Sequence, residues 1–259
     1  MKVALSIAGS DPIGGAGIQA DVKAMAALGV HCCTAITAVT SQNSKGVQRV
    51  LPLGHEDIAG QIASVLADAV PDAVKFGMLH GPAVTETVRE ALAGCDSPMV
   101  LDPVMVATSG GRLDSDDLVA ALVRDVFPMC LLVTPNRFEA EILSGIEIRD
   151  GDDAARACET IGKGGIAVLL KGGHMDGSVV RDLLYADSEF TFLEHPRLGL
   201  AGHGSGCTLS SYITANLAKG LPLKDAVVSA RRTMQDAIST GYDVGPGRVV
   251  NPMAGRPWE

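Results

Sequence analysis

Several features that identify common classes of protein are absent from this chain of 259 residues. Its six cysteines form no C-x-x-C pair, so zinc-ribbon and thioredoxin-type sites lack support. It contains neither the G-x-x-x-x-G-K-[ST] phosphate loop nor the G-x-S-x-G turn of serine hydrolases. Aromatic residues make up only 3% of the chain, so we expect a core built from Ala, Val, Leu and Ile.

Charge and hydropathy exclude two kinds of partner. The net charge is −9 without a basic block, which argues against nucleic acid. No apolar run reaches the roughly 18 residues that a membrane helix requires, so no membrane partner is expected. The apolar start of the chain ends at Gly9–Ser10–Asp11–Pro12 and is typical of a buried strand rather than a signal peptide. Reduced thiols in the cytoplasm fit the cysteine content best.

The remaining sequence alternates between strand and helix patterns. A hairpin is expected around Asp187–Ser188, a polar loop at 40–53 and an irregular tail from Gly241. Strands are expected at 3–8, 30–39, 73–76, 99–104, 131–133 and 166–170. Helices are expected at 16–28, 56–69, 85–93, 114–123, 139–143, 152–161, 207–218 and 223–239. This alternation predicts an α/β fold with a mostly parallel sheet between helices, as one domain over residues 1–259.

Polar and glycine residues recur where the predicted strands end. In parallel sheets, ligands bind beyond the carboxyl ends of the strands, so this shared location predicts a ligand site. The residues at these positions are Gly9, Asp11, Gln42, Met78, Asp102, Asn136, Glu139 and Lys171.

The stretch Gly202–Leu209 carries the most specific local signal. Three glycines alternate with polar residues and lead directly into a helical pattern. Glycine lets the backbone approach a ligand, and a helix start adds unpaired N–H groups, so the stretch predicts an anion site, most simply for phosphate. Cys207 lies at that helix start, where a thiol is acidified. The alternative is a glycine turn followed by a small buried cysteine.

Several other motifs can be explained either by a function or by local structure alone. Gly15–Ala20 matches the G-x-G-x-x-A dinucleotide fingerprint, but positions 30–45 hold no acidic residue for the ribose. Asp21 is either a solvated charge at a helix start or a ligand contact. Asp102 and Glu139 could bind Mg²⁺. Asn136 with Glu139 could equally be a helix capping box.

Taken together, these blocks resemble the hydroxymethylpyrimidine/phosphomethylpyrimidine kinases of thiamine biosynthesis. The blocks that carry the resemblance are residues 8–23 (AGSDPIGGAGIQADVK), 37–43 (TAVTSQN), 75–79 (KFGML), 101–105 (LDPVM), 134–136 (TPN) with Glu139, 171–174 (KGGH) and 204–209 (GSGCTL). They occur in the family's order over nearly the whole chain. The resemblance implies a ribokinase-like three-layer sandwich, usually a homodimer, that phosphorylates 4-amino-5-hydroxymethyl-2-methylpyrimidine and then its monophosphate with ATP.

The resemblance also implies roles for individual residues. Gln42 would bind the pyrimidine, in a pocket lined by Gly9, Asp21, Met78 and Val104. Gly204, Ser205 and Gly206 with the Cys207 N–H would form the anion hole, and Cys207 would act as the base. Asp102, Asn136 and Glu139 would organise Mg²⁺ and the ATP phosphates, with the two carboxylates as metal ligands. Lys171 would neutralise the transferred charge.

Three competing functions stay open at this point. A pyridoxal kinase of the same fold is the nearest, although Gln42 and Met78 favour a pyrimidine. A catalytically inactive regulator would be expected to lose Cys207, Lys171 or the glycine loop, all of which are present. A dehydrogenase would bind nicotinamide.

The sequence differs from the commonest pattern of the family it resembles at three places. Ser205 stands where threonine is frequent, and the segments around Ala201–Gly202 and at 245–252 also differ from that pattern.

Overall fold

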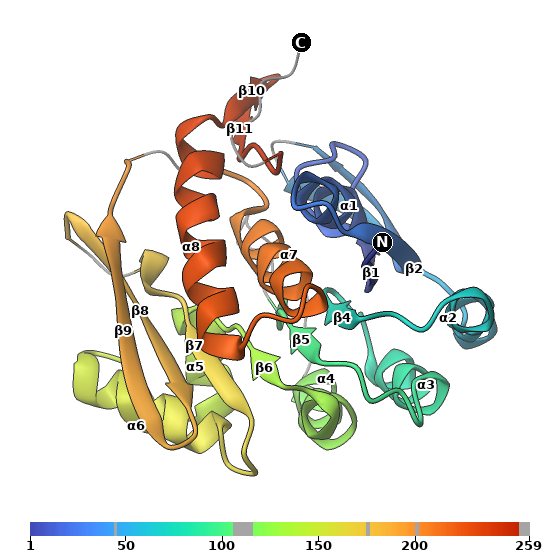
Figure 1. The fold of residues 1–259 in the computed structure, drawn as a ribbon, viewed down its shortest axis with the longest axis horizontal. Coiled ribbons are helices and arrows are strands. Elements are labelled where there is room, and N and C mark those ends of the chain that lie inside the picture. The colour runs from blue at the N-terminus through green and yellow to red at the C-terminus, as the bar shows by residue number, and fades with distance from the viewer. Residues whose placement is uncertain (44–45, 106–115, 175–176, 200–201, 254–259) are drawn as a thin grey trace.

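The computed structural model describes residues 1–43, 46–105, 116–174, 177–199 and 202–253. These residues form a mixed nine-stranded sheet in the order β3-β2-β1-β4-β5-β6-β7-β8-β9 (Figure 1). The parallel strands are β2 (His31–Asn43), β1 (Val3–Ser10), β4 (Ala73–Phe76), β5 (Met99–Leu101), β6 (Leu132–Val133) and β7 (Ala167–Leu170). Antiparallel strands complete both edges: β3 (Gly46–Pro52) on one side, β8 (Val179–Ala186) and β9 (Glu189–Pro196) on the other.

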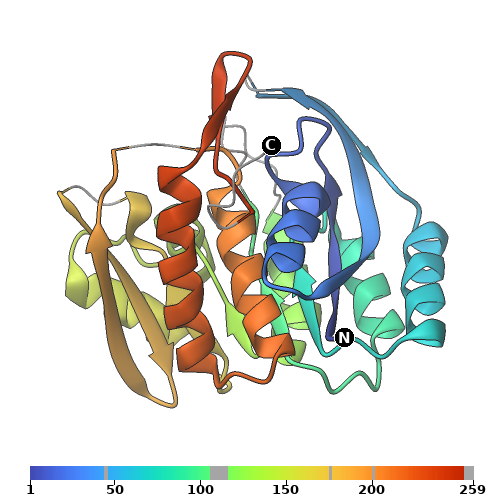
Figure 2. The ribbon, with the colours of Figure 1, turned by 45° about the horizontal axis from the view of Figure 1, so that its top comes forward.

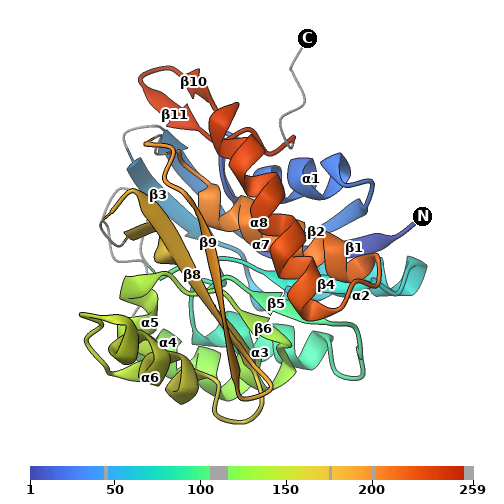
Figure 3. The ribbon, with the colours of Figure 1, turned by 60° about the vertical axis from the view of Figure 1, so that its left-hand side comes forward.

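Two helical layers cover the sheet, one on each face (Figure 3). One layer holds α1 (Gly17–Ala27), α7 (Ser205–Ala218) and α8 (Leu223–Ser239). The other holds α2 (His55–Asp68), α3 (Pro82–Ala91), α4 (Asp116–Ala121), α5 (Arg137–Ser144) and α6 (Gly151–Ile161). A π-helical turn (Leu122–Val126) and a 3-10 turn (Phe127–Met129) follow α4, and a second 3-10 turn (Gly172–His174) follows β7.

The two cores follow from the alternation of side chains along each strand. On β1, Ala4 faces the α1, α7 and α8 layer, where Met25 and Tyr212 are buried. Leu5 faces the other layer and packs with Ile58 of α2. Small residues on one face and large ones on the other allow both helical layers to pack closely. The α/β three-layer architecture predicted from the sequence is confirmed.

The structure differs from the sequence predictions at three places. The polar loop expected at 40–53 is wrong for the described residues of that range, because β2 continues to Asn43 and pairs with β3, with Val39 opposite Leu51. The tail is not irregular throughout, since β10 (Tyr242–Val244) and β11 (Gly247–Val249) form a short hairpin. The β5 strand ends at Leu101, which leaves Asp102 just beyond it. The helix start expected at Asp114–Ser115 lies outside the described residues.

Other predicted elements are confirmed. The β8–β9 hairpin turns at Asp187 and Ser188, both with positive φ (52° and 63°), as a two-residue type I′ turn requires. The β10–β11 hairpin, which follows α8, lies at the same end of the molecule as the far end of the β2–β3 ribbon (Figure 2). Within the described ranges, no helix is both long enough and apolar enough to cross a membrane.

Candidate active site

Lys171 lies beside two of the predicted site carboxylates at the carboxyl edge of the sheet. It follows β7, and its backbone bridges that of Asn136, which follows β6. Its Nζ atom lies 2.8 Å from Oδ1 of Asp102 and 4.0 Å from Oε2 of Glu139. Strands β5, β6 and β7 are neighbours in the sheet, so their ends deliver these groups to one place. The structure therefore brings Asp102, Asn136, Glu139 and Lys171 together.

Charge and burial in this cluster oppose each other. Burial alone would lower the pKa of the Lys171 ammonium, but Asp102 and Glu139 outweigh it and raise that pKa, so Lys171 stays charged. Burial, reinforced by the nearby charge of Asp102, raises the pKa of Glu139 to about 7, against the opposing effect of Lys171. Even beside Lys171, Glu139 is therefore not fully ionised at neutral pH, and a further positive charge would favour its ionised form.

Asn136 and Glu139 also form the capping box of α5. The Glu139 N–H donates to Asn136 Oδ1 at 3.0 Å, and the Asn136 N–H donates to Glu139 Oε2 at 2.8 Å. The capping interpretation is therefore confirmed. It leaves Glu139 beside Lys171, so the cap also fixes this carboxylate in the site.

The start of α7 faces the Lys171 cluster. Gly204 precedes the helix in the left-handed conformation (φ 84°), and the first helical hydrogen bond runs from Thr208 N–H to the Gly204 carbonyl. The amides of Ser205, Gly206 and Cys207 therefore have no carbonyl partner within the helix. A Cβ on Gly206 would lie 3.3 Å from Asp102 Oδ2 and 3.4 Å from Lys171 Nζ. Helix amides and an ammonium group thus meet at one point, which suits a phosphate.

Cys207 is not the acidified thiol that its position at a helix start predicted. Burial raises the pKa of this thiol to about 11. Lys75 and a backbone hydrogen bond from Gly17 act in the opposite direction, while the carboxylates of Asp102 and Asp21 reinforce the rise. Loss of hydration therefore outweighs the effect of the helix terminus, and the sulfur is protonated at neutral pH.

A second group of predicted residues lies at the ends of β1, β2 and β4. A Cβ on Gly9 would come within 2.5 Å of Met78 Cε, so glycine is required for the thioether to lie there. Gln42 hydrogen-bonds the carboxylate of Asp11. Val104 lies two residues after Asp102, and its N–H donates to the Asp102 carbonyl at 2.8 Å, which places it next to the Lys171 cluster.

Asp21 is the predicted site residue that the structure places elsewhere. Its carboxylate is fully buried beneath the site and forms an ion pair with Lys75 at 2.7 Å. Ser211 donates to the same oxygen, and Ser6 donates to the other. Both oxygens are occupied by the chain itself, so Asp21 is neither a solvated helix-start charge nor a residue that offers a free acceptor to a ligand.

The comparisons with known proteins agree with this geometry. Residues 11–253 match the family described as phosphomethylpyrimidine kinase. The chain belongs to this family. A hydroxymethylpyrimidine/phosphomethylpyrimidine kinase of Rhizobium meliloti is 44% identical over 95% of this chain and 94% of its own length. One of Streptomyces coelicolor is 42% identical over 94% and 91%.

Solved structures of the family and its neighbours share the fold. The phosphomethylpyrimidine kinase of Clostridium difficile superposes with a TM-score of 0.82 at 39% identity, covering 92% of this chain and all of its own. The pyridoxal kinase of Staphylococcus aureus in complex with AMP-PCP gives a TM-score of 0.90 at 31% identity, covering 98% of this chain and 94% of its own. The ribokinase-like fold expected from the resemblance is thereby confirmed.

Three residues that build the site of this family member received no role of their own from the sequence. Asp11 accepts hydrogen bonds from the amides of Ile13, Gly15 and Ala16 and so shapes the first glycine loop. From the sequence, Lys75 was named only within the block 75–79, and His203 was included only within the stretch Gly202–Leu209. An aspartate followed by several glycines is a signal for such a loop, whereas nothing local marks Lys75 as fully buried.

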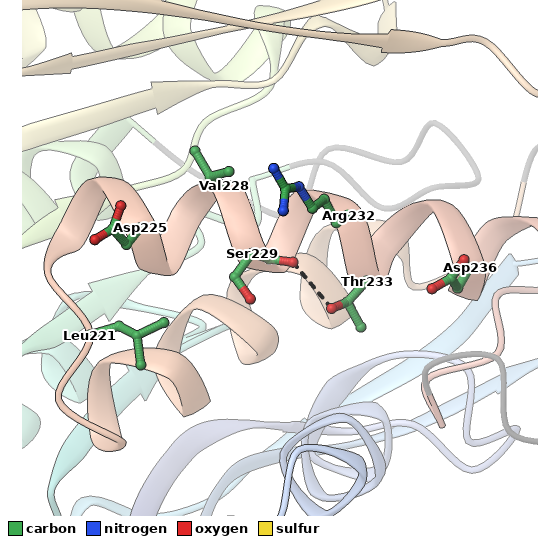
Figure 4. Close-up of a pocket in the computed structure, with 7 residues that line it drawn as sticks. All are labelled: Leu221, Asp225, Val228, Ser229, Arg232, Thr233 and Asp236. Carbon is green, nitrogen blue, oxygen red and sulfur yellow. Dashed lines mark hydrogen bonds between the residues drawn. The ribbon is translucent and has the colours of Figure 1, made fainter.

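A separate groove runs along the outside of α8 (Figure 4). Thr233 Oγ1 donates to the Ser229 carbonyl within it at 3.1 Å. The residues that line it are Leu221, Asp225, Val228, Ser229, Arg232, Thr233 and Asp236. None of them is a predicted site residue, so the groove is not the phosphate site.

Proposed function

We propose that this chain transfers the γ-phosphoryl group of ATP to the hydroxymethyl group of 4-amino-5-hydroxymethyl-2-methylpyrimidine, and then transfers a second one to the resulting monophosphate. The observation that carries the proposal is the convergence of the α7 amides, the Lys171 ammonium and the Asp102 carboxylate around Gly206. Phosphoryl transfer depends mainly on positioning and charge stabilisation, which these groups supply. The names of the relatives support the choice of acceptor.

Each group then has a role in phosphate handling. The amides of Ser205, Gly206 and Cys207 would hold the migrating phosphoryl group, with Gly204 shaping the turn. Lys171 would balance its charge, and Asn136 would contact ATP. Asp102 and Glu139 fit Mg²⁺, because this ion takes carboxylate oxygens together with nucleotide phosphates. When bound, Mg²⁺ would neutralise phosphate charge, and it would also favour the ionised form of Glu139.

Cys207 is proposed as the proton acceptor of the first transfer. The hydroxymethyl oxygen attacks the γ-phosphorus, the bond to the ADP oxygen breaks, and the hydroxyl proton passes to the sulfur. This role requires the sulfur to ionise in the loaded site, since burial keeps it protonated in the free chain. The second transfer attacks with an already ionised phosphate, so it needs this base less.

The acceptor pocket is proposed at the ends of β1, β2 and β4. Gln42 offers an amide with both a donor and an acceptor to the pyrimidine ring. Gly9 and Met78 lie against each other and would form an apolar wall, with Val104 beside Asp102. In this proposal the ring would lie between the β2 end and the phosphate-binding cluster.

The test is ATP turnover with the pyrimidine alcohol, followed by mass detection of the mono- and diphosphate. Lys171→Met should abolish both products. Cys207→Ala should slow the first transfer more than the second in single-turnover experiments with each substrate. Cys95→Ala is the matched control, because Cys95 precedes β5 at the opposite edge of the sheet. Equal losses in both steps would refute the role of Cys207, and no phosphorylated product would refute the function.

A second candidate function is phosphorylation of pyridoxal. The observation that favours it is the TM-score of 0.90 with a Staphylococcus aureus pyridoxal kinase solved in complex with pyridoxal. The identity to that protein is 32%, below the 44% shared with the Rhizobium pyrimidine kinase. Turnover of both acceptors at equal concentration decides between them, and we expect the pyrimidine to be preferred.

Assembly and location complete the proposal. Val39 and Leu51 are directly opposite each other on the β2–β3 ribbon and remain 42% and 49% exposed. A second copy of the chain would cover them, so we propose a homodimer, which sedimentation analysis tests. All six cysteines are free, which suits the reducing cytoplasm.

A further inference from the structure

His203 directly precedes the phosphate loop Gly204–Gly206, and the proposed chemistry does not use it. Its Nε2 atom lies 3.1 Å from Oδ2 of Asp11, a carboxylate in the first glycine loop. Burial raises the pKa of Asp11, but hydrogen bonds from His203, Gln42 and two amides outweigh it and lower the pKa overall. The carboxylate is therefore ionised and can only accept, so the imidazole Nε2 carries the proton and donates it.

The other side of His203 is held by the tail of the chain. Its N–H donates to the Arg248 carbonyl at 2.9 Å, and its own carbonyl accepts from Val250 N–H at 3.4 Å. The tail is fixed in turn, because Asn251 N–H donates to the Ala237 carbonyl at 2.8 Å and Tyr212 Oη donates to the Pro252 carbonyl at 3.0 Å. His203 thus lies between an anchored tail strand and the first glycine loop.

The backbone beyond His203 leaves little room for adjustment. A Cβ on Gly204 would lie 1.6 Å from the Gly15 carbonyl oxygen, so the two glycine loops are in direct backbone contact. A Cβ on Gly15 would lie 2.7 Å from the imidazole Cδ2 of His203. The helix α7 fixes the loop from one end, and the hydrogen bond from His203 to Asp11 fixes it from the other. The same Asp11 carboxylate also bonds Gln42.

We propose that His203 is a positioning residue of the kinase, whose hydrogen bond to Asp11 holds the phosphate loop Gly204–Gly206 at the correct distance from the acceptor pocket. The proposal rests on the proposed kinase function. Loss of the imidazole leaves Asp11 with its three amides and with Gln42, so the acceptor pocket stays intact. The phosphate loop then keeps only the backbone contact of Gly204 with Gly15 and the backbone bonds of residue 203 to the tail, and it loses the side-chain bond that ties it to Asp11. A displacement near 1 Å in such a site lowers the rate by about 100-fold.

The test compares His203→Ala, His203→Gln and His203→Asn. The glutamine amide reaches the position of Nε2, whereas the shorter asparagine amide ends near Nδ1. We expect kcat to fall about 10- to 100-fold in the Ala and Asn variants, with recovery to within about 3-fold in the Gln variant. KM for the pyrimidine should stay within about twofold in all three. His55→Ala is the control, because His55 is an exposed histidine outside the site.

A second readout does not depend on turnover. Calorimetry with β,γ-methylene ATP should show at least about fivefold weaker binding to the Ala and Asn variants, with an unchanged number of sites. A purely structural role would lower the number of sites and the thermal midpoint instead, with Gln no better than Asn, and that result would overturn the proposal. So would wild-type kcat and nucleotide affinity in all three variants. An inactive wild-type protein would refute the kinase function alone, while the calorimetry would still decide the role of His203.

Discussion

Replacement of Lys75 is the most direct test of how much the buried Lys75–Asp21 ion pair beneath the site stabilises the fold. Lys75 and Asp21 are both fully buried and lie 2.7 Å apart. Lys75→Met would leave the Asp21 carboxylate with only the hydroxyls of Ser6 and Ser211. Breaking a buried ion pair in this way costs about 3–5 kcal/mol, a large share of the 5–15 kcal/mol that stabilises a typical domain.

A double-mutant cycle separates the charge from the packing. Asp21→Asn alone leaves the buried ammonium without its directly paired carboxylate and should also be strongly destabilising. The combination Lys75→Met with Asp21→Asn removes both charges, so it should lose less than the sum of the single losses by at least about 2 kcal/mol. Urea unfolding followed by circular dichroism measures these differences, and a slope near 3 kcal/mol per M gives midpoint shifts of about 1–1.7 M for the single variants.

The pH dependence provides an internal check. Burial lowers the pKa of Lys75, but Asp21 and the other nearby negative groups outweigh it and raise that pKa above its ordinary value of 10.5. Stabilisation from a raised lysine pKa is complete below the unfolded value and disappears only at higher pH. The Lys75→Met loss should therefore be the same at pH 7 and pH 9. A loss below about 1 kcal/mol, or strictly additive single losses, would refute the reasoning.

Three further predictions follow from the glycine loop, the thiol and the cap. Gly204→Ala should destabilise the fold by at least about 2 kcal/mol more than Gly220→Ala. Both glycines have positive φ, but only at Gly204 would the new Cβ meet backbone, namely the Gly15 carbonyl. Equal losses of unfolding free energy in urea would contradict this. Cys207 should react with iodoacetamide about 100-fold more slowly at pH 7 than an ordinary thiol, given its pKa of about 11. Peptide mapping over a range of pH measures this rate, and a rate midpoint near pH 7 would disprove the conclusion that burial dominates the pKa. Asn136→Ala should cost about 1 kcal/mol by uncapping α5, and an unchanged unfolding free energy would show that Glu139 does not need its cap partner.

The parts of the fold that sequence predicted well depend on local pattern. Short, mainly apolar runs such as 73–76 and 167–170 are buried on both faces, so their hydrophobicity marks them as central parallel strands even though Lys75 lies within the first. Because parallel strands have their carboxyl ends at the same edge of the sheet, the sequence also predicts that Asp102, Glu139 and Lys171 lie close together there. The β3 strand was missed because it lies at the edge, where Gln48 and Arg49 face solvent and resemble loop residues.

The errors in the site have a common physical origin. Asp21 has the sequence context of an exposed carboxylate one turn into a helix, and only its partners on β1, β4 and α7 make burial possible. The helix terminus predicts an acidified Cys207, but the pKa depends on how much water the whole surrounding fold removes. Burial of a polar group is decided by distant segments, and no local pattern reports it.

The hydrogen bonds of Asp21 also bear on the order in which this chain acquires structure during synthesis. Its partners lie 15, 54 and 190 positions away along the chain. A nascent polypeptide leaving the ribosome can form the first two contacts early, but Ser211 emerges only after four-fifths of the chain has been translated. Until then α7 cannot cover β1, and an apolar sheet face stays open to other chains. A family member of this topology therefore gains its protection against aggregation late in translation.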